Sequence, residues 1–118
     1  MKTELTVVYV GVNGNSNRGK YFYSYDPSIL LIEEHDCPIT FSLSDETPKH
    51  YAIKDIFFSS SEKQFKDIAI SSDGRCVSFT NKNSKKRLIS LSILVEDTKL
   101  NNLINCDPQV MNKPPSNS

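Results

Sequence analysis

The chain has 118 residues, a length typical of one domain that buries a core without disulfides or metal. Its 14 basic and 14 acidic residues cancel, which removes any electrostatic attraction to nucleic acid or to an anionic membrane. No apolar run approaches the roughly twenty residues of a membrane span. The 3 cysteines are scattered and odd in number, which is typical of reduced thiols. We therefore expect a cytoplasmic protein with no nucleic-acid or membrane partner.

The chain begins with an apolar stretch at residues 5–12, which we interpret as a first strand. It is a poor signal peptide, because Glu4 stands where positive charge is needed and Thr6 and Tyr9 interrupt the run. Residues 13–19 are a polar Gly/Asn loop. A second, tyrosine-rich strand follows at residues 20–25, and Asp26-Pro27 ends it because proline lacks a backbone donor.

Six further strands are predicted, at residues 28–33, 38–43, 51–58, 65–70, 76–80 and 87–96. The last is the clearest, because apolar residues occupy every second position and so share one face. These residues are Ile89, Leu91, Ile93 and Val95. Between the strands at 65–70 and 76–80, Asp73-Gly74 is a pair typical of a tight hairpin turn.

Two segments have less regular patterns. Residues 59–62 (SSSE) could begin a single helical turn. Leu100, Leu103 and Ile104 have helical spacing, although so short a run fits a looped corner over the core equally well. Residues 113–118 (KPPSNS) have no apolar anchors, which predicts a single domain over residues 1–112 and a flexible tail.

Short strands separated by turns favour an all-β fold over alternating strands and helices. We predict a two-sheet antiparallel sandwich with Greek-key connections, immunoglobulin-like or cupredoxin-like. Residues 14–20 (GNSNRGK) match the first seven positions of a phosphate-binding loop. Tyr21 stands where that loop needs a Ser or Thr hydroxyl, and no helix follows, so a polar hairpin loop is the better interpretation.

Metal-ligating residues are few. A blue-copper site needs Cys, His and Met closely spaced near the C-terminus, and no histidine lies near Cys106 or Met111. His35 and Cys37 alternate in one short segment, and with His50 they are candidates for a ligand site in the loops. His35 and Cys37 alone are too few ligands for a metal site. The alternative interpretation is that these are ordinary residues of surface loops. We assign no metal and no cofactor.

Catalytic motifs are equally scarce. No GxSxG elbow or Gly-rich oxyanion loop marks any serine as a nucleophile. Triads assemble in space rather than in sequence, so the lack of these motifs disfavours an enzyme without excluding one.

Tyr21, Tyr23 and Tyr25 alternate along the second strand. If exposed, this row of tyrosines is a rigid amphipathic surface suited to a protein partner or a sugar. The alternative is a buried stripe with its hydroxyls at the rim.

Several short motifs resemble a known family. They are Tyr25-Asp26-Pro27 before a short apolar strand, PITFSL at residues 38–43, and DPQVMN at residues 107–112. This layout resembles the small bacterial family called DP-EP and, more loosely, inclusion-body proteins of the AidA/PixA type. The resemblance implies a cytoplasmic bacterial β-sandwich, self-associating and without an established catalytic residue.

Two functions therefore remain open. The first is a non-catalytic interaction or self-assembly module that uses the edge strand at residues 20–25 or the tyrosine row. The second is a small-ligand or metal-binding domain that uses loops at one end of the sandwich, around His35, Cys37 and His50.

Overall fold

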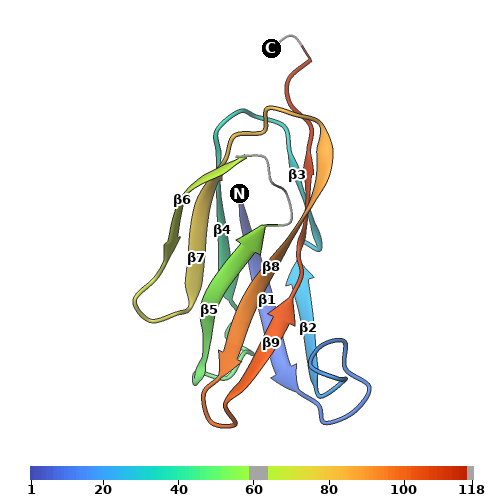
Figure 1. The fold of residues 1–118 in the computed structure, drawn as a ribbon, viewed down its shortest axis with the longest axis vertical. Coiled ribbons are helices and arrows are strands. Elements are labelled where there is room, and N and C mark those ends of the chain that lie inside the picture. Colours follow the sequence, from blue (N-terminus) through green and yellow to red (C-terminus); the bar gives the residue numbers. More distant parts are fainter. Residues whose placement is uncertain (59–63, 117–118) are drawn as a thin grey trace.

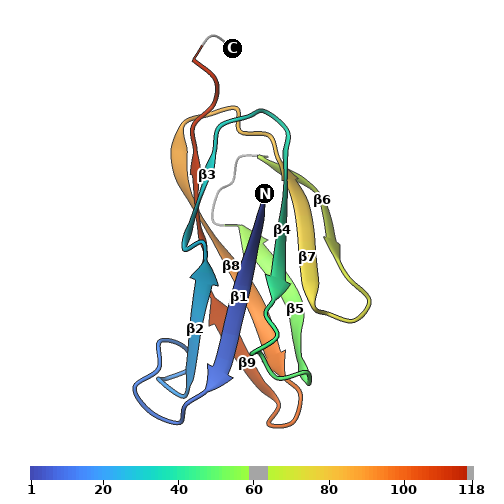
Figure 2. The ribbon, with the colours of Figure 1, turned by 180° about the vertical axis from the view of Figure 1, so that it is seen from behind.

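Ten strands and no helix form in the described part of the chain, residues 1–58 and 64–116 of a computed structural model. In chain order they are β1 (Lys2–Tyr9), β2 (Tyr21–Asp26), β3 (Ile29–Ile32), β4 (Cys37–Leu43), β5 (Tyr51–Phe58), β6 (Phe65–Ile70), β7 (Cys76–Asn81), β8 (Arg87–Asp97), β9 (Asn102–Cys106) and β10 (Gln109–Asn112). The first sheet has the order β2-β1-β4-β7-β6 and the second β3-β10-β8-β5, with β9 also paired to β8. The predicted all-β sandwich is confirmed (Figures 1 and 2).

The predicted antiparallel arrangement is only partly correct, because both sheets are mixed. β1 pairs in parallel with β4, and β3 pairs in parallel with β10. The cause lies at Asp26-Pro27, where the chain leaves the first sheet and joins the edge of the second. Pro27 has no amide hydrogen, so the ladder of β2 cannot continue through it. β3 then runs beside β10 instead of β1.

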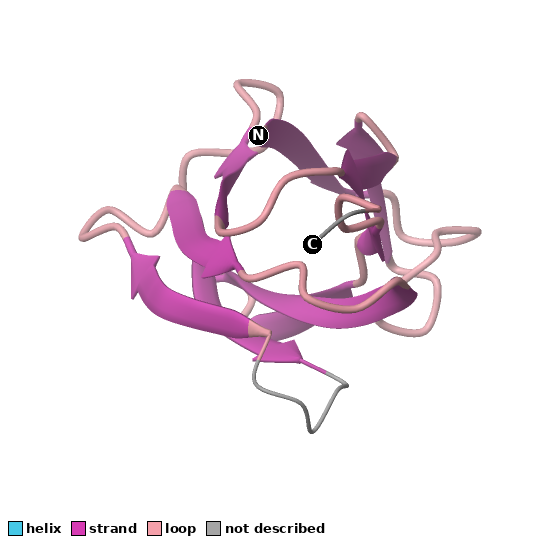
Figure 3. Ribbon diagram, turned by 90° about the horizontal axis from the view of Figure 1, so that it is seen from above, coloured by secondary structure: helices cyan, strands magenta, loops and turns pink. Residues whose placement is uncertain are grey.

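Figure 3 shows the strands from above, arranged around the interior of the sandwich. The core fills this interior, and β8 supplies its longest inward face. Its alternate residues are buried, as the sequence pattern predicts. They are Ile89, Leu91, Ile93, Val95 and Asp97. The sequence pattern did not predict a buried Asp97. Its carboxylate accepts hydrogen bonds from Tyr21 and from the amides of Lys99 and Leu100.

The largest differences from the predicted elements lie in the first strand and in the segment after β8. β1 begins at Lys2 and ends at Tyr9, because Gly11 (φ 84°) and Asn13 (φ 62°) leave the extended region. Neither a helix nor a looped corner covers residues 100–104. After a turn with Asn101 at φ 55°, the chain returns as β9 and pairs with β8. The predicted helical turn at residues 59–62 lies outside the described residues.

Arg75 fixes the connection that carries the chain from β4 in the first sheet to β5 in the second. Its guanidinium donates four hydrogen bonds, to the backbone carbonyls of Ser44, Thr47, Pro48 and Tyr51, at 3.0–3.1 Å. The Leu43 amide donates to the Arg75 carbonyl at 2.8 Å. A planar guanidinium supplies this fan of donors, whereas an ammonium group cannot.

Replacing Arg75 with Lys should therefore lower the free energy of unfolding by about 2 kcal/mol, because partly buried carbonyls lose their donors. Urea unfolding measures the change. Circular dichroism is a suitable probe, because the chain has no tryptophan for fluorescence. Arg18→Lys, at an exposed loop position, is the control and should have almost no effect. Equal effects at both positions would contradict this role for Arg75.

Two asparagine substitutions, one on each face of β8, test which face of this strand is buried. Ile93 is fully buried, whereas Ser92 is half-buried on the outer face and donates to Asp107 Oδ1 at 2.8 Å. We expect Ile93→Asn to cost about 4 kcal/mol, because it removes core volume and buries an unpaired amide. Ser92→Asn should cost less than about 1 kcal/mol. Similar losses in urea unfolding would show that the assigned register is wrong.

Candidate functional site

An apolar patch lies on the outer face of the second sheet, formed by Ile29, Leu31, Leu88 and Met111. Ile29, Leu31 and Leu88 are 53%, 45% and 53% exposed. Met111 pairs with Leu31 on one side and with Leu88 on the other, so three neighbouring strands contribute to one row. Exposed apolar side chains that adjoin one another, unlike scattered ones, are typical of an interaction surface. We call these four residues the outer patch.

The local sequence explains why the outer patch is apolar. β3 reads ILLI, and alternation buries Leu30 and Ile32 while Ile29 and Leu31 point outward. A continuous apolar run of this kind is typical of a strand covered on both faces. The described chain covers only one face of β3. The signal in the sequence is the unbroken apolar run at residues 29–32, inside the strand predicted at residues 28–33.

Charged residues of opposite sign flank the outer patch at one end of the sheet. Glu33 and Glu34 follow the last residue of β3, and Lys85 and Lys86 precede the first residue of β8. All four are exposed. Ile32, Asn112 and Arg87 form one row across the three strands. The acidic and basic pairs therefore lie at the same level along the strand direction, on opposite sides of β10.

A buried polar cluster lies at the other end of the sandwich, around Asp97. Tyr21 donates to Asp97 Oδ2 at 2.6 Å, and His50 Nε2 lies 3.1 Å from Oδ1. The amides of Lys99 and Leu100 also donate to Oδ1. Burial acts to raise the pKa of the Asp97 carboxyl, but the hydrogen bonds that it accepts, above all from Tyr21, outweigh burial and lower this pKa.

The contacts of the Asp97 cluster indicate a structural role at this end of the sandwich rather than a catalytic one. It joins β2, the start of β5, and the turn from β8 to β9, three segments that are distant in the sequence. A histidine held by a carboxylate can act as a general base, but it needs a nucleophile or a substrate beside its free nitrogen. The hydrogen bonds described for this cluster are instead directed inward, to backbone and core groups.

The three predicted ligand residues do not form one site. His35 and Cys37 lie in and after the β3–β4 connection, at the end of the sandwich that holds the outer patch. His50 lies at the opposite end, just before β5 (Figure 1). His35 is exposed and Cys37 is buried. Within residues 1–58 and 64–116, no group of three or more His, Cys, Asp or Glu side chains could hold a metal ion.

The tyrosines of β2 form a fully or partly buried stripe rather than an exposed row. Tyr21 is fully buried, and Tyr23 and Tyr25 pack against the core. The Tyr25 hydroxyl donates to the Cys106 carbonyl at 3.0 Å, and burial strongly raises the pKa of Tyr25. The tyrosine row is therefore corrected to a structural role, which was the alternative interpretation of its spacing.

The loop that resembles a phosphate-binding loop covers two sheet edges. Asn15 exchanges two hydrogen bonds with the backbone of Tyr23 in β2, at 2.8 and 2.9 Å. Ser16 and Asn17 donate to the Asn105 and Leu103 carbonyls of β9, at 2.7 and 2.9 Å. Side chains thereby occupy groups that an added strand would use. On β2 these side-chain bonds cover the backbone of Tyr23, and the use of residues 20–25 as an interaction edge stays a prediction.

Gly14 permits this loop to fold back so closely. A Cβ at this position would lie 2.1 Å from the Tyr21 carbonyl oxygen, so any other residue would force the loop off β2. The loop is closely packed against the chain, rather than shaped as an open cradle of amides for a phosphate.

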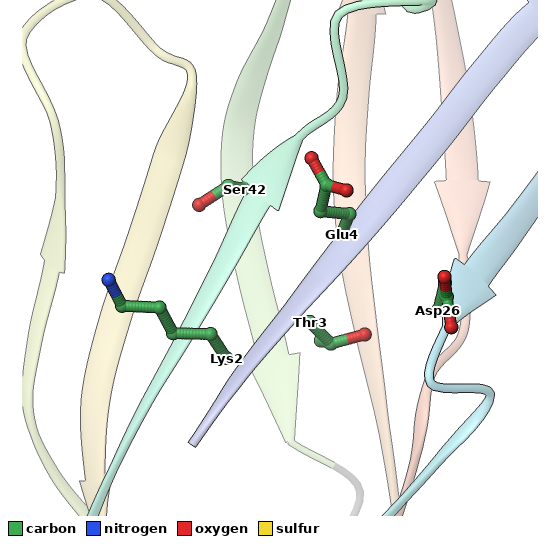
Figure 4. Close-up of a pocket in the computed structure, with 5 residues that line it drawn as sticks. All are labelled: Lys2, Thr3, Glu4, Asp26 and Ser42. Carbon is green, nitrogen blue, oxygen red and sulfur yellow. The ribbon is translucent and has the colours of Figure 1, made fainter.

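Two of the open pockets lie away from the outer patch, and both are lined by charged residues. One has a volume of about 550 Å³ and is lined by Asp45, Lys49, Asp73 and Arg75, but Arg75 is already committed to four carbonyls. The other lies on the outer face of the first sheet (Figure 4). There Glu4 and Asp26 are cross-strand partners, with Ser42 of β4 on the other side of Glu4. The residues that line these two pockets do not form a recognisable catalytic or ligand-binding arrangement.

Comparisons with known proteins assign no family. No protein-family model matches this chain, and a search of curated proteins finds no match. The described part of the chain contains no helical segment with the length and hydropathy of a membrane span. The fold defines a β-sandwich, and its function has to be inferred from its surface.

The Asp97 cluster predicts a specific response to acid. Because the folded-state pKa of Asp97 is lowered, its stabilising contribution is present above the unfolded value of about 4 and is lost as the pH falls through the folded value. Asp97→Asn should lower the free energy of unfolding by about 2 kcal/mol at neutral pH, and this difference should shrink in acid. Urea unfolding across the pH range measures both.

The matched control is Asp45→Asn, which removes an exposed carboxylate at the same end of the sandwich. It should change stability by less than about 0.5 kcal/mol at every pH. A pH-independent loss for Asp97→Asn would show that packing, rather than the ionised carboxylate, stabilises the cluster.

Proposed function

We propose that this protein is a non-catalytic self-assembly module that associates through the outer patch. The row of Leu31, Met111 and Leu88 across three strands carries the proposal, because it exposes adjoining apolar side chains on a regular face. The ILLI sequence of β3 supports it, since such a run suits a strand that is covered on both faces.

The sheet edges at β2, β9 and β6 are less suited to assembly than this face. The loop at residues 13–19 occupies backbone groups of β2 and β9. β6 has a register shift between Lys66 and Ala69, with Asp67 at φ 57°, which interrupts the regular pattern that an added strand needs. Association through a face, with strands of two copies stacked, avoids both obstacles.

The proposal includes a cytoplasmic location and membership of the DP-EP family. The free thiols of Cys37, Cys76 and Cys106 support a reducing compartment. The DP-EP resemblance, with its implied bacterial origin and self-association, agrees with an assembly role. It contributes no site residue, so the outer patch is argued from the geometry alone.

Light scattering over a range of protein concentrations tests the proposal. The wild type should form a discrete oligomer, and the double variant Leu31→Ser/Leu88→Ser should weaken its association by at least about tenfold, because both removed side chains are apolar and exposed. The variant should keep wild-type stability within about 1 kcal/mol.

Leu103→Ser is the matched control, since Leu103 is 50% exposed on β9 of the same sheet but lies outside the outer patch. It should leave the oligomer intact. A wild type that stays monomeric at every concentration would overturn the proposal.

A further inference from the structure

We infer that the outer patch binds a second copy of this chain about a two-fold axis parallel to β10, with the acidic pair Glu33/Glu34 of each copy facing the basic pair Lys85/Lys86 of the other. This inference depends on the proposed function and specifies its partner and geometry. It makes the assembly a closed dimer, because a two-fold face-to-face contact uses the same surface on both copies.

The strand order determines which residues meet. β10 lies between β3 and β8, so rotation about an axis parallel to β10 stacks β3 of one copy over β8 of the other. Positions along the strands do not change in this rotation. Leu31 therefore faces Leu88 of the second copy, and Met111 faces Met111, because these residues share one row. Stacked sheets with nearly aligned strands are a common packing arrangement.

The flanking charges select this orientation. Glu33 and Glu34 directly follow β3, while Lys85 and Lys86 directly precede β8, so both pairs extend beyond the same end of the patch. The rotation that stacks β3 on β8 brings each acidic pair to a basic pair, and it does so twice. An axis perpendicular to the strands would instead stack β3 on β3, so that each acidic pair would lie over the Ile29 end of β3 and not over Lys85 and Lys86.

The overall charge of the chain also permits self-association. The formal net charge is zero, so two copies do not repel one another at long range. Local charges then determine orientation, since complementary rim charges steer association and suppress the wrong arrangements.

The size of the outer patch predicts a dimer of modest affinity. Standard interfaces bury about 800 Å² on each partner, which is more than four partly exposed side chains supply. The rim must therefore contribute, including Gln109 and Ser90, which form the next row of the same face. Exposed ion pairs are screened by salt, so salt should weaken this dimer.

Charge reversal on each side tests the geometry. The acid-reversed variant is Glu33→Lys/Glu34→Lys, and the base-reversed variant is Lys85→Glu/Lys86→Glu. Each alone places like charges at both contacts of the dimer, and should weaken self-association by at least about tenfold. Mixed in equal amounts, the two variants have opposite charges at both contacts. Native mass spectrometry and light scattering should then detect a one-to-one complex close to wild-type affinity.

A third variant controls for simple attraction between oppositely charged proteins. Asp45→Lys/Glu46→Lys has the same net charge as the acid-reversed variant, but its changes lie in the exposed β4–β5 connection at the far end. It should dimerise like the wild type, and its complex with the base-reversed variant should be clearly weaker than that of the acid-reversed variant.

The outcomes separate this inference from the proposed function. If the wild type dimerises, Leu31→Ser/Leu88→Ser prevents it, and both charge-reversed variants still dimerise, the outer patch assembles in another orientation and the inference is wrong. An assembly that grows beyond a dimer also overturns the inference. If the wild type is monomeric and the mixture forms no complex, the proposed function fails with it.

Discussion

The burial of one face of β8 is the interaction on which the rest of the sandwich depends. Three strands pair with β8, namely β5 along one side and β9 and β10 in succession along the other. Its inward side chains also form the middle of the core. Because side chains alternate along a strand, burying Ile89 requires Leu88 to point outward. The same constraint that forms the core thus produces the exposed patch.

Most of the polar residues that suggested a binding site in the sequence instead form hydrogen bonds with backbone groups of the fold. Asn15, Ser16 and Asn17, in the loop resembling a phosphate site, bond to the edges of β2 and β9. A buried carbonyl or amide without a partner costs free energy, so a small domain uses many side chains to satisfy such groups. Residue type alone does not distinguish this use from ligand binding.

The surface divides into a polar and an apolar part for a related reason. β4 and β7 of the first sheet expose mainly hydroxyl side chains, whereas β3 and the start of β8 in the second sheet expose aliphatic ones. The edge strands of the first sheet also expose apolar side chains, among them Phe22 and Ile68. β3 is the origin of this difference, because it leaves the first sheet at Asp26-Pro27 and carries its apolar run to the edge of the second. A strand switch thus places two outward-facing aliphatic residues beside Met111 and Leu88.

The sequence by itself determined the all-β class, most strand positions and the inward face of β8, because alternation is a local property read from neighbouring residues. It also identified the Asp73-Gly74 hairpin, whose turn chemistry is local. Only the tertiary structure decided that β3 pairs in parallel with β10, that His50 meets Asp97, and that residues 102–106 form a strand. These features depend on contacts between segments far apart in the chain, which no local pattern encodes.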